Sequence, residues 1–281
     1  LCPISTDGLG TYLLAPLAEA GVKPLLGERV EAYTTLAVVT FDARKSAQYG
    51  FYRNADRAFT REGLIAALPQ RLEAFQVGGF CPIEPEDAGV WLDVAQEAAR
   101  RGATLTMDPN VRPSLVPDFA GYKQRLSSFL GIVNLVKVSI EDLASLEQNR
   151  AVRATELTAA EVEALVEKYT ADFLGRPNCE LVIVTFGEEG SRAFTRSGSA
   201  RQDVYPAVPF GDTVGAGDTL MAAVLTLLNE QGNLKPGRLG AMGDAALAKM
   251  LRFGAVAAGL NCQFVGCHPP TRAEVDAVLA D

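Results

Sequence analysis

The residues best suited to chemistry lie in one stretch of the chain, residues 211–224. It contains a tight turn of Gly215, Ala216 and Gly217, then Asp218, then a run of small and apolar residues that predicts a buried helix. Glycines let a backbone turn tightly and approach a ligand closely. The start of a helix presents unpaired N–H groups and a positive dipole end, which favours an anion such as phosphate. Asp218 can therefore accept a proton from an attacking hydroxyl while the backbone holds a phosphoryl group.

The composition restricts the classes of protein to which this chain can belong. Its 281 residues are 48% hydrophobic and 21% charged, which is typical of a globular protein with a sizeable core. A formal net charge of -8 disfavours general binding to nucleic acids. The five cysteines are odd in number and scattered, which favours a reducing compartment over a disulfide framework. No apolar run is long enough to span a membrane and the first residues lack a secretory pattern, so we expect a cytoplasmic protein without nucleic-acid or membrane partners.

The elements that must position this stretch alternate between strands and helices. Apolar runs predict strands at residues 74–79, 104–107, 132–138 and 181–185. Helical patterns predict helices at residues 62–72, 85–101, 126–130, 141–147, 159–169, 241–260 and 272–279, and residues 211–229 comprise the glycine turn with the helix that follows it. This alternation predicts an α/β fold, a doubly wound, mostly parallel sheet with helices on both faces.

A hairpin interrupts the alternation near the start of the chain. Residues 34–41 and 47–52 predict two strands with a turn at residues 42–45, and such a pair belongs to a small sheet of its own. An earlier helix is expected before Gly21, capped by Ser5, Thr6 or Asp7. We therefore expect an α/β domain of residues 1–30 and 59–281, with a β-hairpin at residues 31–58.

Ligands of such sheets bind beyond the carboxyl ends of the strands, and three further polar clusters lie at such ends. Arg112, after the strand at 104–107, can contact a phosphate or a sugar acid through two N–H groups, and Asn110 can order water around a cation. A plain turn explains the same residues. After the strand at 132–138, Glu141 or Asp142 can hold Mg²⁺ through water, or Ser139 and these acids can simply cap a helix.

The third cluster follows the strand at residues 181–185. Gly187 and Gly190 permit a close backbone approach to a nucleotide beside Thr185, although a hairpin turn needs the same glycines. A Gly-x-Gly-x-x-Gly turn after an early strand is absent, which excludes a dinucleotide-binding oxidoreductase of the usual pattern.

These four clusters, in this order, resemble the ribokinase-like (PfkB) carbohydrate kinases, and among them the fructokinase-like branch. Residues 212–218 are similar to the family's C-terminal signature, and residues 108–113 to a segment of fructokinases and 2-keto-3-deoxygluconate kinases. The resemblance implies that Asp218 is the catalytic base and that Gly215, Ala216 and Gly217 form the anion hole. It assigns the remaining roles to other positions: Thr185, Gly187, Gly190 and Asn261 to the nucleotide, Arg53 and Arg112 to the sugar, and Asp142 with Asn110 to a metal through water.

The resemblance also implies the reaction and its partners. We expect transfer of the γ-phosphate of ATP, with Mg²⁺, to a primary hydroxyl of a free sugar, under a lid formed by the hairpin. Fructose is the first candidate and 2-keto-3-deoxygluconate the alternative, in which Arg53 and Arg112 hold the sugar carboxylate. A requirement for a monovalent cation stays open, and a homodimer formed through the lid is expected.

Two departures from the family pattern keep a different class of function open. The family's Asn-x-x-Glu motif reads Ser139-x-x-Asp142 here, as in fructokinase-like members, and the chain starts downstream of the family's first sugar-binding motif. We therefore expect a leading segment in the full-length protein. The alternative is a catalytically inactive kinase-like module for binding or assembly, against which the intact Asp218 and its glycines argue.

Overall fold

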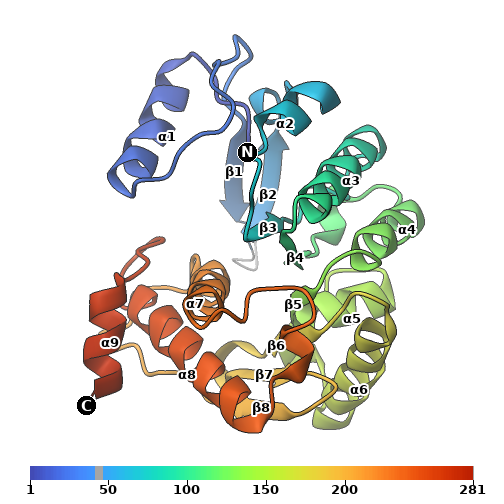
Figure 1. Cartoon of the computed structure of the whole chain (residues 1–281), viewed down its shortest axis with the longest axis vertical. Coiled ribbons are helices and arrows are strands. Elements are labelled where there is room, and N and C mark those ends of the chain that lie inside the picture. Colours follow the sequence, from blue (N-terminus) through green and yellow to red (C-terminus); the bar gives the residue numbers. More distant parts are fainter. Residues whose placement is uncertain (42–46, 281) are drawn as a thin grey trace. The chain divides into compact units, whose positions relative to one another are not determined.

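The chain divides into two units in a computed structural model, which describes residues 1–41 and 47–280 (Figure 1). The first unit comprises Leu1–Gln70 and Gly89–Glu97, and the second comprises Arg71–Ala88 and Ala98–Asp281. The helix α3, Pro85–Arg100, contributes residues to both units. None of the described helices is long and apolar enough to cross a lipid bilayer.

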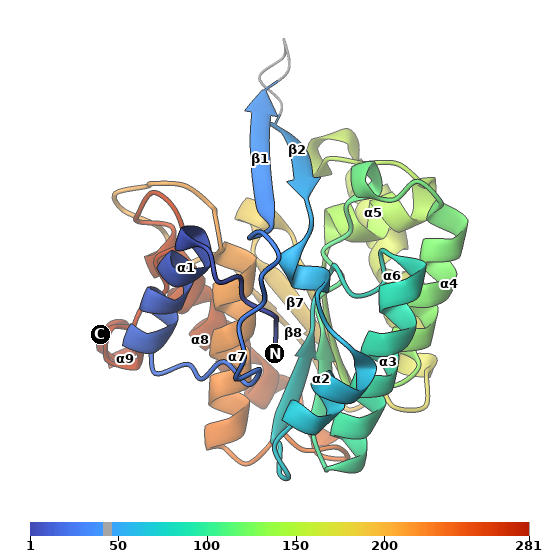
Figure 2. The same cartoon turned by 90° about the horizontal axis from the view of Figure 1, so that it is seen from above.

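The first unit contains the antiparallel hairpin that the sequence predicts. Strand β1 (Leu36–Phe41) pairs with β2 (Ala47–Tyr52), and Figure 2 shows the two side by side. The expected turn at residues 42–45 lies outside the described residues. Besides its part of α3, this unit contains α1 (Gly8–Glu19), η1 (Ala55–Arg57) and α2 (Arg61–Ala67).

The ends of these helices have local causes. Asp7, one of the three expected caps, accepts a hydrogen bond from the amide of Gly10 and begins α1. Helix α2 ends at Ala67, and the expectation of a helix to residue 72 is wrong. Leu68 is extended there because it precedes Pro69, and a proline disfavours the helical conformation of the residue before it.

The second unit is organised on a six-stranded sheet with the order β3-β4-β5-β6-β7-β8. The first four strands are parallel, as expected, and β7 and β8 join them antiparallel. Strands β4, β5 and β6 lie in the middle and are almost entirely buried, which their continuous apolar runs predict. The strands span Ala74–Val77, Thr104–Met107, Leu135–Ser139, Leu181–Thr185, Ser191–Phe194 and Ser199–Gln202.

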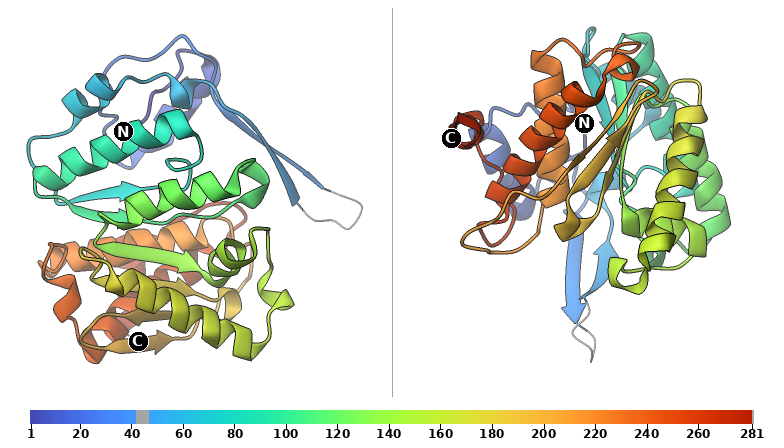
Figure 3. Two further views of the ribbon diagram at one scale, coloured as in Figure 1. Left: turned by 90° about the vertical axis from the view of Figure 1, so that its right-hand side faces the viewer. Right: turned by 90° about the horizontal axis from the view of Figure 1, so that it is seen from below.

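Helices cover both faces of this sheet (Figure 3). Helices α5 (Ile140–Gln148) and α6 (Ala159–Gly175) pack against β5 and β6 on one face. Helices α7 (Ala216–Glu230) and α8 (Asp244–Asn261) pack together on the other face, with α8 against β7 and β8. The described helices of this unit also include α4 (Phe119–Leu130) and α9 (Arg272–Ala280), with short turns η2 (Pro113–Leu115), η3 (Ala154–Glu156), η4 (Gly187–Glu189) and η5 (Leu239–Ala241).

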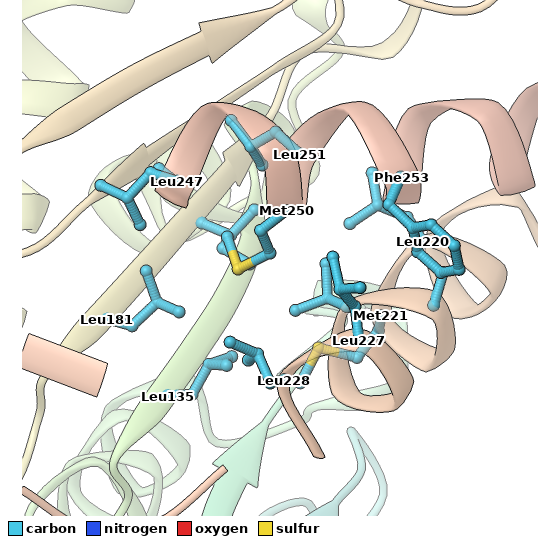
Figure 4. Packing of buried hydrophobic residues seen from close by; sticks show 14 of the residues in the cluster. Leu135, Leu181, Leu220, Met221, Leu227, Leu228, Leu247, Met250, Leu251 and Phe253 are labelled. Carbon is cyan, nitrogen blue, oxygen red and sulfur yellow. The ribbon is translucent and has the colours of Figure 1, made fainter. Parts of the chain in front are cut away.

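The core under α7 and α8 holds these two helices on the sheet. Leu135 and Leu181 on the strands, Leu228 on α7 and Met250 on α8 lie together in a buried apolar cluster (Figure 4). Each of these four side chains is fully buried. The apolar surface that they remove from water holds the helix rigidly to β5 and β6.

Two further expectations about these elements need correction. Helix α4 begins at Phe119, where Asp118 caps Gly121, and not near residue 126. Strands β7 and β8 were not expected, because both are short and include a charged side chain, and while β7 alternates between buried and half-buried residues, β8 has no buried residue. The helix expected after the glycine turn is α7, which begins at Ala216.

Candidate active site

Three of the polar clusters meet at one edge of the sheet. Parallel strands all point the same way, so the residues that end β4, β5 and β6 emerge together. Asp108 follows β4, while Ser139 at the end of β5 lies opposite Thr185 at the end of β6. The sequence prediction that these clusters converge is therefore confirmed for the strand ends.

Two oppositely charged side chains pair at this edge. The ammonium nitrogen Nζ of Lys137 lies 2.5 Å from Oδ2 of Asp108. The two side chains are only 6% and 12% exposed. The start of α7 lies beside this pair, because a Cβ added to Gly217 would lie 3.1 Å from Nζ of Lys137.

The turn that precedes α7 leaves two backbone donors available. Gly215 adopts the left-handed conformation with φ of 76°, as a tight turn requires. The amide of Ala216 donates to Thr213 at 3.1 Å and the amide of Thr219 donates to Gly215 at 2.8 Å. Within residues 1–41 and 47–280, the amides of Gly217 and Asp218 have no hydrogen-bond partner. Both donors lie at the positive end of a 15-residue helix, where an anion is favoured.

Asp218 provides an exposed carboxylate at the same helix start. Its carboxylate oxygens make no hydrogen bond or ion pair to any other described residue. A carboxylate in water without such partners can accept a proton. The turn thus brings a base and two hydrogen-bond donors together within three consecutive residues.

Side-chain hydrogen bonds from Asp212 and Asn261 hold this turn in place. Asp212 accepts hydrogen bonds from the amides of Val214 and Gly266, each at 2.8 Å. Asn261, at the end of α8 and fully buried, donates to the carbonyl of Val214 at 2.8 Å and accepts from the amide of His268 at 2.9 Å. Both polar groups of the Asn261 side chain are therefore engaged with the backbone next to the turn.

Asp142 holds the loop after β4 against the start of α5. Its two carboxylate oxygens accept the amides of Val111, at 2.7 Å, and of Ser139, at 2.8 Å. The hydroxyl of Ser139 accepts the amide of Asp142 in return, which confirms Ser139 as the N-cap. Burial raises the pKa of Asp142 against the opposing effect of the hydrogen bond from Ser139.

The neighbouring loop residues predicted to bind sugar and metal are exposed. Arg112 donates to the carbonyl of Val111 at 3.1 Å, and Asn110 has a positive φ of 43°. The described residues contain no group of three histidine, cysteine or acidic side chains that could hold a metal ion. Proteins usually hold Mg²⁺ through one or two carboxylates together with waters and substrate phosphates.

The glycines after β6 have different causes. Gly190 has φ of 88°, and a Cβ there would lie 2.1 Å from the carbonyl oxygen of Gln202, so packing against β8 requires glycine. Gly187 has φ of 59° with open space around the position of a Cβ. Thr185 is half-buried at the end of β6. The glycines build the β6–β7 turn, and Gly187 leaves room for a ligand.

Arg53 lies in the first unit, directly after β2. Its Nε and a terminal nitrogen each lie 2.7 Å from Oδ2 of Asp56, and its side chain is 14% exposed. The hydroxyl of Thr35 also donates to Asp56. The guanidinium predicted to contact the sugar is thus held in one orientation by an acid of its own unit.

Lys137 is a charged residue at this edge to which the sequence patterns assigned no role, whereas Ser139 and the acids after it were predicted to cap a helix or hold a metal. The available signal was a charged side chain between Val136 and Val138 in an otherwise apolar strand. A lysine in a buried strand has to pair with an opposite charge, so its position predicts a site where charged groups meet.

Comparison with known proteins decides the family. Residues 1–274 match the pfkB family of carbohydrate kinases. The chain belongs to this family. The family and the kinase class expected from the turn at residues 212–218 are thereby confirmed.

Individual relatives agree with this assignment. The chain is 28% identical over 252 residues to "Probable fructokinase-3" of Arabidopsis thaliana, an alignment that covers 88% of this chain and 66% of that protein. A fructokinase structure from Xylella fastidiosa with bound ATP is 23% identical with a TM-score of 0.80, covering 100% of this chain and 84% of that one. A ribokinase structure from Giardia lamblia is also 23% identical, with a TM-score of 0.75 and coverage of 99% and 81%. These structures confirm the ribokinase-like α/β fold.

Proposed function

We propose that this protein transfers the γ-phosphoryl group of ATP to a primary hydroxyl of fructose. The observation that carries the proposal is the start of α7, where the exposed carboxylate of Asp218 lies beside the unpaired amides of Gly217 and Asp218. A base and an anion site in contact are what phosphoryl transfer to a hydroxyl requires. The likeness to proteins named fructokinase supports fructose as the acceptor.

Each part of the edge has a role in this reaction. Asp218 accepts the proton of the attacking hydroxyl, and the turn of Gly215, Ala216 and Gly217 holds the transferred group through the free amides at the start of α7. When bound, ATP supplies the phosphoryl group. We assign its contacts to Thr185 and Gly187 after β6, while Gly190 and Asn261 shape the backbone around them.

The remaining assignments belong to the same proposal. Arg53 and Arg112 contact the sugar, and Asn110 with Asp142 orders water around Mg²⁺. The hairpin of residues 31–58 acts as a lid, through which two copies of the chain form a homodimer in the cytoplasm. A monovalent-cation requirement is decided by assaying activity in potassium and in tetramethylammonium salts.

The substrate is tested by a coupled assay for ADP release with several acceptors. We expect ATP-dependent turnover with fructose that exceeds turnover with 2-keto-3-deoxygluconate and with adenosine by at least about tenfold in kcat/KM. Preferred turnover of 2-keto-3-deoxygluconate would reassign Arg53 and Arg112 to its carboxylate. A nucleoside preference would contradict both sugars.

The same assay tests the non-catalytic alternative. A binding module would bind ATP in calorimetry yet phosphorylate none of the acceptors. The proposal instead expects ATP consumption and sugar phosphate formation in equal amounts, because the lid excludes water from the transferred group.

A further inference from the structure

We propose that Lys137 is a further catalytic residue, whose ammonium contacts the transferred phosphoryl group, and that Asp108 is the positioning residue that holds it. The inference rests on the proposed phosphoryl transfer. It adds to the start of α7 a third donor, which comes from the sheet and carries a full charge. The argument depends on how Lys137 is buried, on what it pairs with and on what it faces.

The burial of Lys137 has no sufficient structural cause. The residue is 5% exposed, and its strand neighbours Val136 and Val138 are fully buried. Removing a lysine from water is costly, and a buried ion pair is often no more stable than apolar side chains of similar size. A methionine or leucine would fill this part of β5 without that cost, so packing alone does not explain the charge.

The pairing of Lys137 leaves donors unused. An ammonium has three N–H groups. Among the described residues, Asp108 is the one hydrogen-bond acceptor of Nζ, at 2.5 Å. Asp108 therefore neutralises the charge and directs the nitrogen, while two N–H groups remain for another acceptor.

The direction of the ammonium points to what that acceptor is. Nζ lies against Gly217, since a Cβ on that residue would lie 3.1 Å from it. The amide of Gly217 is one of the two free donors at the positive end of α7. A cation beside a positive helix end is unfavourable unless an anion lies between them, and a phosphoryl group satisfies both.

The chemistry assigns Lys137 an electrostatic role only. The hydroxyl oxygen bonds to the γ-phosphorus as the bond from that phosphorus to the bridging oxygen breaks. ADP leaves with the electron pair, and Asp218 receives the hydroxyl proton. Lys137 keeps its own proton and stabilises negative charge on the oxygens of the transferred group.

The test combines kinetics with nucleotide binding in Lys137→Met. We expect kcat with fructose to fall by about 100-fold or more, as for loss of one donor to a transition state. Calorimetry without sugar should show about tenfold weaker binding of ATP but ADP affinity within about twofold of wild type, because ADP lacks the γ-phosphate. Lys137→Arg should recover part of kcat. Lys168→Met is the matched control, because Lys168 forms an exposed ion pair with Glu147 at 2.6 Å.

A second variant keeps the proposal testable if Lys137→Met does not fold. If Lys137→Met leaves Asp108 unpaired and does not fold, Asp108→Asn/Lys137→Met removes both charges together and is measured instead. A folded variant of either kind that keeps kcat and the preference for ATP over ADP within about twofold of wild type contradicts the proposal.

The calorimetric comparison of ATP and ADP binding distinguishes failure of this inference from failure of the proposed function. A wild-type protein that binds ATP but phosphorylates no sugar would refute the function, and the ATP-to-ADP comparison would still decide the contact with Lys137. A wild-type protein that binds neither nucleotide would refute both.

Discussion

At the scale of single residues, Gly215 has two separate reasons to lack a side chain. Its φ of 76° is unfavourable for other residues. In addition, a Cβ would lie 2.5 Å from Sγ and 3.1 Å from Cβ of Cys267. The loop that carries Cys267 thus fits directly against the turn that presents the free amides.

The substitution Gly215→Ala is therefore expected to destabilise the protein by more than its backbone conformation alone explains. Gly102→Ala is the control, because Gly102 also has a positive φ, 95°, but has nothing within 4 Å of a Cβ. Denaturant unfolding should show a loss of about 1–2 kcal/mol for the control and a larger loss for Gly215→Ala. Adding Cys267→Gly to Gly215→Ala should remove the excess loss of stability. Equal losses of stability in Gly215→Ala and Gly102→Ala would contradict the steric account.

At the scale of elements, Asp7 connects helix α1 to the segment that leads into β1. Its carboxylate caps Gly10 at 2.7 Å and accepts both the hydroxyl and the amide of Thr34, at 2.7 and 2.8 Å. The hydrogen bonds from Thr34, more than that from Gly10, hold the pKa of Asp7 well below its ordinary value. One side chain therefore joins the start of α1 to Thr34, 27 residues further along the chain.

This contact predicts a pH dependence of stability. A carboxyl group whose pKa is lower in the folded state stabilises the fold above its unfolded pKa of about 4, and that contribution is lost as the pH falls further. Asp7→Asn should thus be less stable than wild type at about pH 7, and the difference should shrink at about pH 3. Denaturant unfolding at both pH values measures this. For Asp203→Asn, at an 81% exposed side chain, no such convergence is expected; a pH-independent effect of Asp7→Asn would refute the assignment.

At the scale of the whole molecule, the apolar cluster of the second unit holds α7, whose start carries the candidate active site, on the sheet. Leu228 on α7 is fully buried against the sheet and α8. It lies far along the helix from the turn at its start. Stability and chemistry can therefore be changed separately on the same helix.

Leu228→Ala is expected to lower the free energy of unfolding by about 2–5 kcal/mol, because it leaves a cavity in a packed core. The exposed Val208, 77% accessible, supplies the control Val208→Ala, which should cost under about 0.5 kcal/mol. At temperatures where both variants are folded, their KM for ATP should match that of wild type. A loss under about 1 kcal/mol for Leu228→Ala would show that this cluster packs loosely.

Much of this architecture could be predicted from local patterns. The strands at 104–107 and 181–185 were predicted at their observed bounds, because short apolar runs between turn residues leave few alternatives. The turn before α7 was recognisable from its glycines and acids. By contrast, β7 and β8 form because β7 pairs with β6 and β8 pairs with β7. The sequence of either segment alone does not indicate this pairing.

The contacts that build the site could not be predicted in the same way. Asp142 was interpreted as a metal ligand or a helix acid, and its bond to Val111 joins residues 31 apart in sequence. Asn261 was assigned to the nucleotide, whereas its own polar groups bond to the backbone beside the turn. Tertiary partners of this kind follow from the fold and leave no mark in the local sequence.

The measurement that tests the central claim most directly is the rate of sugar phosphate formation from fructose and ATP by wild type and Asp218→Asn. The account predicts ATP-dependent turnover by wild type and a loss of at least about 1,000-fold in kcat in the variant, with ATP affinity retained, because the base is lost and the amides remain. Asp172→Asn, at an exposed acid of α6, should keep the wild-type rate. Near-normal turnover by Asp218→Asn would contradict the account.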